Sequence, residues 1–443
     1  PVATEQPGPD RVEHDPEELV TSLREAAAGA LGQLDARVPV AAGLATQRST
    51  IVCWDRQSGV ALTPAISWQD RRAAAELEAL GLDRADLHRR TGLMPSPHYG
   101  ASKLRWCLDH VPAVAAAGDA GRLAMGPLAS FLLYRLLTER PLLADPSNGG
   151  RTLLMNLQRR AWDETLLQRF HIPGAALPRL VPSRHDFGTL RVDGASIPLS
   201  VVHGDQPAAL FADGDPEPES VYLNLGTGAF AQRLSPAPVF ADGLLSGLAA
   251  ADDGRAFYTL EGTVNGADRA LKWAAAELGL ADYESDLCRW LAAIASPPLF
   301  LNGVAGLAAP WWVPDFPSRF LGPGDAPARL VAVAESIVFL LQANMGRMAE
   351  ALGPARRIVC SGGLAALDGL CQRLADLSGL PVQRPAQTEA TARGTAYWLA
   401  GRPDHWPAEA PPEVFDPVAN PALRERYQRW IEAMERDIAI KNE

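Results

Sequence analysis

Lysine and cysteine are scarce in this chain, and its basic residues form no cluster. Its lysines are Lys103, Lys272 and Lys441 alone, and its 5 cysteines are scattered without a Cys-x-x-Cys pair. Such a set is typical of reduced cytosolic thiols and argues against a disulfide framework or a zinc site. The 41 basic and 52 acidic residues give a net charge of −11. This balance argues against broad nucleic-acid binding, although a locally positive cleft could still hold a phosphorylated small molecule.

Apolar runs long enough to span a membrane, about 18 residues, are also missing. The best candidates, residues 131–137 and 331–341, are interrupted by Arg135 and Glu335. The N-terminus has no basic and apolar signal sequence, so secretion is unsupported. With 47% hydrophobic and 21% charged residues, the composition is that of a folded cytoplasmic protein without a membrane segment.

The order of apolar and polar segments predicts a mixed α/β architecture. A helix should start after Asp15, which can cap its first turn, with Pro16 at the first helical position. Apolar runs predict strands at 38–44, 50–54 and 65–68. Strands that alternate with helices in this way indicate an α/β unit.

The length of 443 residues, at about 150 per domain, predicts two or three packed units. The stretch 211–220 is acidic and rich in turn residues, which is typical of a linker between lobes. We therefore expect a first lobe over residues 1–212 and a second over 213–443. The second lobe should end in a polar helix from 422 to 440.

The segment Gly226-Thr227-Gly228 follows a predicted strand and fits the glycine pattern of dinucleotide-binding folds. In those folds the turn opens a helix, whereas the residues after Gly228 predict a second strand. The glycines then form a turn between two strands, which either holds phosphate oxygens with its N–H groups or is a plain hairpin. A P-loop is excluded because no lysine follows a glycine.

A second glycine pair, Gly362-Gly363, lies between a predicted strand and a predicted helix. Open α/β sheets bind nucleotides at such strand ends, because glycine lets the backbone approach a ligand closely. Tight packing of the helix on the sheet explains the pair equally well. Residues 388–397 predict a helix with small side chains on one side, which permits close approach of another helix or of a flat ring.

Asp205 and Gln206 come directly after the strand predicted at 198–202. A carboxylate at a strand end suits general-base chemistry, and a neighbouring carboxamide can hold a hydroxylated substrate. Asp205 could instead cap a helix. Arg48 and Trp68 also lie close to strand ends, and an indole face beside arginine donors is typical of either a polyol site or a surface turn.

Together these segments resemble the FGGY carbohydrate kinase family, and within it the glycerol kinase-like members. The resemblance follows the order of the family's segments over nearly the whole chain. It rests on residues 10–17, 43–48, 65–71, 103–106, 147–152, 204–206, 225–228, 261–264, 306–311, 335–337, 361–363 and 388–397.

The resemblance implies a two-lobed, actin-like kinase fold, with a ribonuclease-H-like sheet in each lobe and a cleft between the lobes. The first lobe would bind the substrate and the second the nucleotide. It further implies ATP as phosphoryl donor, a small polyol or sugar as acceptor, and Mg²⁺ carried mainly by the ATP phosphates, beside Asp205. The implied site residues are Asp205 as general base; Arg48, Trp68, His98 and Gln206 at the substrate; Gly226 and Thr227 at the phosphates; and Gly362 and Gly363 beside the adenosine.

Several positions depart from the family's pattern. Ser49 replaces an acidic residue after the substrate arginine, and His98 replaces a tyrosine. Without that carboxylate we expect weaker binding of glycerol, by about 1.5–3 kcal/mol. Near the nucleotide, Asp268, Lys272 and Asp368 replace the residues usual in the family, which predicts altered nucleotide affinity or choice.

The sequence therefore predicts an ATP-dependent kinase of a small polyol or sugar, which could form a homodimer. The alternative is a catalytically inactive member that binds a carbohydrate or nucleotide as a sensor or assembly subunit. The family's opening Asp-x-Gly-Thr segment, which meets the metal and the phosphate, has no counterpart before Val12. We expect the native polypeptide to carry further residues upstream, because the first sheet would otherwise have an unpaired edge.

Overall fold

The first half of the chain contains two larger sheets and two small two-stranded ones. The computed structural model describes residues 2–34, 39–386, 389–407 and 410–442. The first-half strands are β1 (Glu5–Gly8), β2 (Arg11–His14), β3 (Ala42–Thr46), β4 (Ile51–Asp55), β5 (Ala65–Ile66), β6 (Leu123–Pro127), β7 (Leu143–Ala144), β8 (Met155–Asn156), β9 (Ala161–Trp162), β10 (Arg179–Leu180), β11 (Arg184–Val192) and β12 (Ala195–Gly204). The helices are α1 (Pro16–Gly32), α2 (Ala74–Ala79), α3 (Arg84–Thr91), α4 (Gly100–His110), α5 (Pro112–Asp119), α6 (Leu128–Leu136), α7 (Pro146–Gly149), α8 (Glu164–Arg169) and α9 (Asp205–Ala209), with short 3₁₀ turns η1 (Gly150–Thr152) and η2 (Gly174–Ala176).

The two larger sheets of this half have the strand orders β1-β2-β5-β4-β6 and β11-β12-β3. In the second sheet β3 and β12 are parallel, with Leu44 opposite Val202 and Thr46 opposite Gly204. Parallel strands in register end at the same edge, so the residues after Thr46 and Gly204 are brought together there. Among the described residues, β3 pairs on one side only, with β12.

The second half of the chain is built on one seven-stranded sheet of order β15-β16-β14-β13-β19-β20-β21. Its strands are β13 (Ser220–Leu225), β14 (Ala229–Ser235), β15 (Leu245–Ala251), β16 (Ala256–Val264), β19 (Arg357–Ser361), β20 (Val382–Arg384) and β21 (Glu413–Phe415), with a separate pair β17 (Leu299–Leu301) and β18 (Arg319–Leu321). The helices are α10 (Asp268–Glu277), α11 (Tyr283–Ala293), α12 (Ala326–Leu352), α13 (Asp368–Ser378), α14 (Ala390–Leu399) and α15 (Pro421–Asn442), with the 3₁₀ turn η3 (Gly363–Ala366). Because β13 and β19 are parallel, with Asn224 opposite Ser361, the turns that follow them also lie at one edge.

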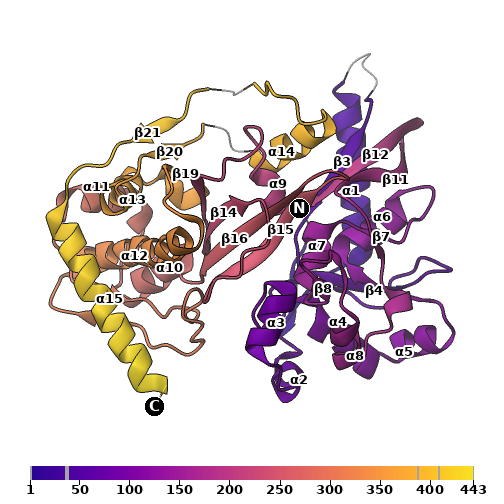
Figure 1. Ribbon diagram of the computed structural model, residues 1–443, viewed down its shortest axis with the longest axis horizontal. Helices are drawn as coiled ribbons and strands as arrows, with labels where there is room; N and C mark the ends of the chain where they lie inside the picture. Colours follow the sequence, from indigo (N-terminus) through magenta and orange to yellow (C-terminus); the bar gives the residue numbers. More distant parts are fainter. Residues whose placement is uncertain (1, 35–38, 387–388, 408–409, 443) are drawn as a thin grey trace.

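Figure 1 shows the two halves of the chain side by side, with β14, β15 and β16 drawn between them. The largest apolar core draws only on residues from 221 to 438, and two smaller cores draw only on residues from 20 to 202. A fourth core joins Val201 and Phe211 to Phe257 and Trp398. Each half therefore has its own core, and a smaller apolar contact connects them.

Helix α14 belongs to the second half of the chain but packs on the first. A Cβ atom at Gly394 would lie 1.8 Å from the carbonyl oxygen of Ala208 in α9, and one at Gly43 would lie 2.4 Å from Cγ2 of Thr395. The small side chains expected on this helix thus serve close helix packing. Thr388, which the prediction included, lies outside the described residues.

The long helix α12 is at the centre of the second half. Glu335, 1% exposed, accepts two 2.8 Å hydrogen bonds from Arg426 of α15, so the last helix is fixed to the core. Among the described residues, α12 is the one helix long and apolar enough to cross a membrane, and 72% of its most apolar window is buried inside the protein. That burial is typical of a core helix.

Several local expectations are confirmed. Asp15 caps α1 by accepting from Glu17 N and Glu18 N, with Pro16 as the first helical residue. The residues after Gly228 form the strand β14, antiparallel to β13, so the turn is not that of a dinucleotide-binding fold. The strand predicted from 38 to 44 begins only at Ala42, and Val38 lies outside the described residues.

Candidate active site

Arg48, Asp205 and Gln206 meet where β3 and β12 end together. Nη2 of Arg48 donates a 2.7 Å hydrogen bond to Oε1 of Gln206. Asp205 is not a helix cap, because it is the first residue of α9 and Gly204 takes the cap position. Its Oδ1 accepts from the N–H of Gln206 at 2.7 Å, and its own carbonyl oxygen accepts from Oγ1 of Thr391 in α14 at 3.1 Å. The carboxylate is half-buried, so it is held in place without being cut off from solvent.

Arg48 crosses over Gly204, and only glycine leaves room for it. A Cβ atom at position 204 would lie 2.5 Å from Cδ of Arg48. Burial and the neighbouring Arg151 lower the pKa of Arg48 to about 10, while Glu261 and Asp205 act in the opposite direction. Arg48 is therefore a charged donor at neutral pH, in a crowded electrostatic environment.

A cluster of aromatic side chains contains Trp68 and His98, and His98 lies close enough to Arg48 and Arg151 for their charges to lower its pKa. Trp68 is 38% exposed, and its ring meets that of His98 edge-on at 5.6 Å between centroids. His98 in turn packs against Tyr99 at 5.0 Å. Burial, followed by the charges of Lys103, Arg151 and Arg48, lowers the pKa of His98 well below its usual value. His98 is thus neutral near pH 7 and can donate or accept one hydrogen bond at each ring nitrogen.

An ion pair that the sequence did not predict connects this group to the second half of the chain. Arg151 of η1 and Glu261 of β16 form a salt bridge, and the two residues are 7% and 3% exposed. Thr259 donates to Glu261 at 2.7 Å, and Tyr99 lies beside Arg151. Both residues lie in segments that carry the family resemblance, but nothing in the sequence indicated that they pair.

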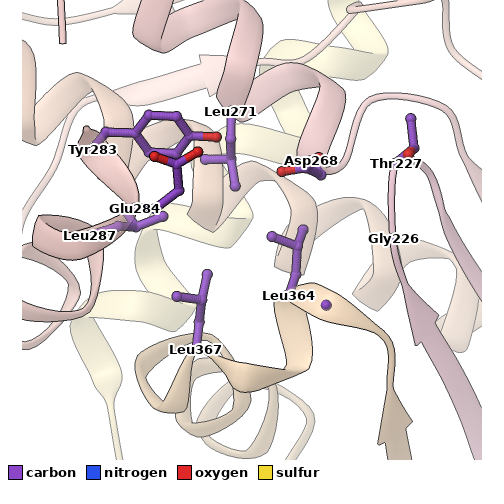
Figure 2. Close-up of a pocket in the computed structure, with 10 residues that line it drawn as sticks. Gly226, Thr227, Asp268, Leu271, Tyr283, Glu284, Leu287, Leu364 and Leu367 are labelled. Carbon is purple, nitrogen blue, oxygen red and sulfur yellow. The ribbon is translucent and has the colours of Figure 1, made fainter. Parts of the chain in front are cut away.

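A cavity of about 320 Å³ lies at the strand ends of the seven-stranded sheet. This volume is at the lower end of ordinary ligand pockets. Its lining comprises Gly226, Thr227, Asp268, Leu271, Tyr283, Glu284, Leu287, Gly363, Leu364 and Leu367. Figure 2 shows Leu364 and Leu367 on one side of the cavity and Tyr283 and Leu271 on the other, so its walls are largely apolar.

The two glycine turns form one end of this cavity. Gly226 N donates to Gly228 O at 2.9 Å, and among the described residues no backbone acceptor is recorded for the N–H of Thr227 or Gly228. Those amides could donate to phosphate oxygens. Gly362 has φ of +91°, and a Cβ atom there would lie 2.6 Å from Leu225 O. Gly362 therefore shapes the turn, while its neighbour Gly363 lines the cavity.

The structure places Asp268 and Lys272 in a different environment from Asp368. Asp268 lines the cavity and pairs with Lys272 at 2.7 Å. Asp368 pairs with Arg384 at 2.8 Å instead and is not part of the lining. The sequence did not indicate the apolar residues of the cavity lining, nor Tyr283 and Glu284 of α11. An ordinary amphipathic helix gives no sign of the cavity that it closes.

Metal coordination by protein side chains alone finds little support. In the part of the chain that the structure describes, no group of three or more His, Cys, Asp and Glu side chains could hold a metal ion. Asp205 therefore belongs to no such group of three, and a divalent cation here would need phosphate or water oxygens for most of its ligands.

Known proteins are similar to this chain over most of its length. Residues 1–212 match the model of the N-terminal domain of the FGGY family of carbohydrate kinases, and residues 221–401 match its C-terminal domain. The chain is 38% identical to a glycerol kinase of Methylobacterium nodulans over 94% of this chain and 88% of the relative. It is also 38% identical to a glycerol kinase of Thermus brockianus, over 98% and 92%.

Solved structures share the fold. A Plasmodium falciparum glycerol kinase with ADP superposes with a TM-score of 0.91 at 23% identity, covering 98% of this chain and 92% of that one. A xylulose kinase from Rhodospirillum rubrum gives a TM-score of 0.85 at 21% identity, with coverages of 99% and 92%. The two-lobed, actin-like α/β architecture expected from the sequence is thereby confirmed.

Proposed function

The chain belongs to the FGGY family of carbohydrate kinases, and from this premise we propose that it transfers the γ-phosphoryl group of ATP to a hydroxyl group of a small polyol, with glycerol as the first candidate. Members of this family are phosphotransferases, so the chain is a carbohydrate or polyol kinase. The relatives named glycerol kinase, 36–38% identical over most of the chain, support glycerol as the acceptor.

The group at the joint ends of β3 and β12 carries this proposal. The Asp205 carboxylate would accept the proton of the attacking hydroxyl group as general base. The hydroxyl oxygen then forms a bond to the γ-phosphorus while the bond from that phosphorus to the bridging oxygen of ADP breaks. Arg48 and Gln206, already joined by their 2.7 Å bond, would hold the other hydroxyl groups.

Trp68 and His98 would cover the C–H side of the polyol. Their edge-to-face contact at 5.6 Å places an indole face and a neutral imidazole side by side. Such a wall excludes water from apolar C–H groups and leaves one ring nitrogen to bond a hydroxyl. A small, linear acceptor suits a site that offers one aromatic pair for C–H groups and two polar side chains for hydroxyl groups.

The cavity between α10, α11 and η3 is the proposed adenosine site. Leu364 and Leu367 face Leu271 and Tyr283 across it (Figure 2), so a flat base would be held between apolar walls. The turn at Gly226 and Thr227, with Gly362 and Gly363 beside it, would place N–H groups near the phosphates. Mg²⁺, when bound, neutralises charge on the transferring phosphoryl group, and phosphate oxygens would provide most of its ligands, with Asp205 beside it.

The acceptor can be identified by measuring ADP release with a panel of glycerol, pentuloses and gluconate. We expect glycerol to be phosphorylated with a high KM, because Ser49 provides no carboxylate beside Arg48 and its hydroxyl lies 3.4 Å from Arg151 O. A carboxylate bond worth about 1.5–3 kcal/mol corresponds to a roughly 10- to 150-fold difference in affinity. Turnover of a pentulose but not of glycerol would show that the acceptor is a pentulose. Turnover of none of the compounds would contradict the proposed activity.

Gly204 provides a test of the Arg48 assignment. In Gly204→Ala the new methyl group would meet Cδ of Arg48 at 2.5 Å, so the guanidinium must move. We expect kcat/KM for the polyol to fall by up to about 10²-fold, as for a misplacement of about 1 Å, with KM for ATP unchanged. Gly346→Ala is the matched control, since nothing lies within 4 Å of a Cβ atom there. Unchanged polyol kinetics in Gly204→Ala would contradict a substrate role for Arg48.

A further inference from the structure

One buried lysine connects the three segments that carry the proposed substrate residues. Lys103 lies in α4 and is 0% exposed. Its Nζ donates to the backbone carbonyl oxygens of Ser49 at 2.7 Å, Ser67 at 2.9 Å and His98 at 2.9 Å. An ammonium group has three N–H donors and no acceptor, so all of its hydrogen-bonding capacity is used on these three carbonyls.

The three carbonyls are adjacent to the substrate side chains. Ser49 follows Arg48, Ser67 precedes Trp68, and the third carbonyl is that of His98 itself. The Ser49 backbone has φ of +63°, a left-handed conformation that residues other than glycine rarely adopt and that costs about 1–2 kcal/mol. A hydrogen bond to its carbonyl helps to hold this conformation and with it the direction in which Arg48 leaves the strand.

We propose that Lys103 is a positioning residue of the polyol site, whose ammonium group fixes the backbone of the Arg48, Trp68 and His98 segments relative to one another. The inference rests on the proposed function, because it concerns the residues assigned there to the acceptor. Lys103 itself does not touch the substrate in this assignment. Its effect should therefore appear in polyol binding, while ATP binding stays unchanged, because Lys103 bonds none of the residues assigned to the nucleotide.

The alternative is that Lys103 only stabilises the fold, and pH separates the two roles. Burial lowers the pKa of Lys103 to about 7, with Asp70 and Cys107 acting to raise it and Arg72 to lower it. Above that pH the neutral amine has two donors for three carbonyls, so one segment is released and KM for the polyol should rise. The resolved pKa shifts of neighbouring groups all point away from this range: the pKa of His98 lies well below its usual value, that of Arg48 is about 10 and that of Arg72 is raised.

The free energy of unfolding should rise over the same pH range in which polyol affinity falls. The pKa of Lys103 is depressed from 10.5 in the folded protein, so between about pH 7 and 10.5 the unfolded chain binds more protons at this residue. Its contribution to the free energy of unfolding therefore rises with pH. If Lys103 is only structural, polyol affinity should not fall as the fold becomes more stable. If Lys103 positions the site, polyol affinity should fall over the same pH range.

The experiment measures KM for glycerol, at saturating ATP, and the free energy of unfolding from pH 6 to 9. We expect the wild-type KM to rise several-fold with a midpoint near pH 7. Lys103→Met should raise KM about 10-fold or more at pH 6, remove the pH dependence, and leave KM for ATP unchanged. Lys441→Met, a change of the same kind at a partly exposed lysine bonded to Asp315, is the control and should behave as the wild type.

Two results would overturn the inference: a wild-type KM that is flat from pH 6 to 9, or a folded Lys103→Met variant with the wild-type KM and pH profile. The wild-type profile needs no variant, so the inference stays testable even where Lys103→Met does not fold. A wild-type protein that phosphorylates no polyol would contradict the proposed function and this inference with it. An active wild type with an insensitive Lys103→Met contradicts only the role of Lys103.

Discussion

Asp205→Asn should fold as the wild type does and phosphorylate its polyol about 10²- to 10⁴-fold more slowly, which is the usual cost of removing a general base. The carboxamide keeps the shape of the side chain and can still accept the N–H of Gln206, which Oδ1 now accepts at 2.7 Å. What it loses is the ability to take a proton from the acceptor hydroxyl. We therefore expect kcat to fall while KM for ATP and the melting temperature stay close to wild-type values.

The matched control for this variant is Asp213→Asn, the same chemical change in the segment that joins the two halves of the chain. The Asp213 carboxylate is 51% exposed, lies 3.9 Å from Arg393 and lines a different cavity with Tyr397. Steady-state rates of ADP formation for both variants and the wild type give the comparison. Turnover by Asp205→Asn within a few-fold of wild type would contradict the general-base assignment.

Local features of the fold could be read from the sequence where the signal is contained in a few neighbouring residues. Asp15 and Pro16 predicted the start of α1 because a cap and a first-turn proline act within one turn. Strand ends were also predictable, since an apolar run followed by Gly-Asp-Gln or Gly-Thr-Gly marks where a strand stops. Arg48, Asp205 and Gly226 were all noticed in this way as residues near strand ends, while their roles in a site came only from the family resemblance.

The contacts between distant segments could not be predicted. The ammonium of Lys103 reaches carbonyls 54 and 36 residues away in sequence, and Arg151 meets Glu261 across 110 residues. A backbone carbonyl exists at every residue, so the sequence gives no sign of which ones a lysine will bind. Likewise Tyr283 and Glu284 close the cavity through the packing of α11, and Asp368 was expected at the adenine but pairs with Arg384.

The Arg151–Glu261 pair deserves its own test because it joins the two halves of the molecule at the proposed site. Glu261 lies on β16, which pairs directly with β14, the strand that starts after the Gly226–Gly228 turn. Arg151 lies beside Tyr99, the neighbour of His98. The pair therefore connects the proposed polyol wall to the strand next to the phosphate turn, and Gly247 makes room for it, since a Cβ atom there would lie 2.8 Å from Oε1 of Glu261.

Breaking this pair should strongly destabilise the protein. Arg151→Met leaves the Glu261 carboxylate buried and unpaired, so we expect the free energy of unfolding to fall by about 3–5 kcal/mol at pH 7. Replacing both residues by methionine should recover most of that loss, because neither charge of the pair then remains buried without its partner. Arg347→Met, which breaks the exposed pair with Glu350, is the control and should cost less than about 1 kcal/mol. Urea titrations of the four proteins measure these differences.

The pH dependence gives a further check on the same pair. Burial alone would raise the pKa of Glu261, but Arg151, Arg48 and the bonds from Thr259 and Arg151 outweigh it, so its pKa lies below the ordinary 4.5. A carboxyl group with a depressed pKa contributes stability above its unfolded value and loses it as the pH falls through the folded value. The stability that Glu261 contributes to the wild-type protein should therefore be constant near pH 7 and decrease as the pH falls below about 4.5. A difference under about 1 kcal/mol between wild type and Arg151→Met at pH 7, as for an exposed pair, would show that the two halves of the molecule are not held together at this point.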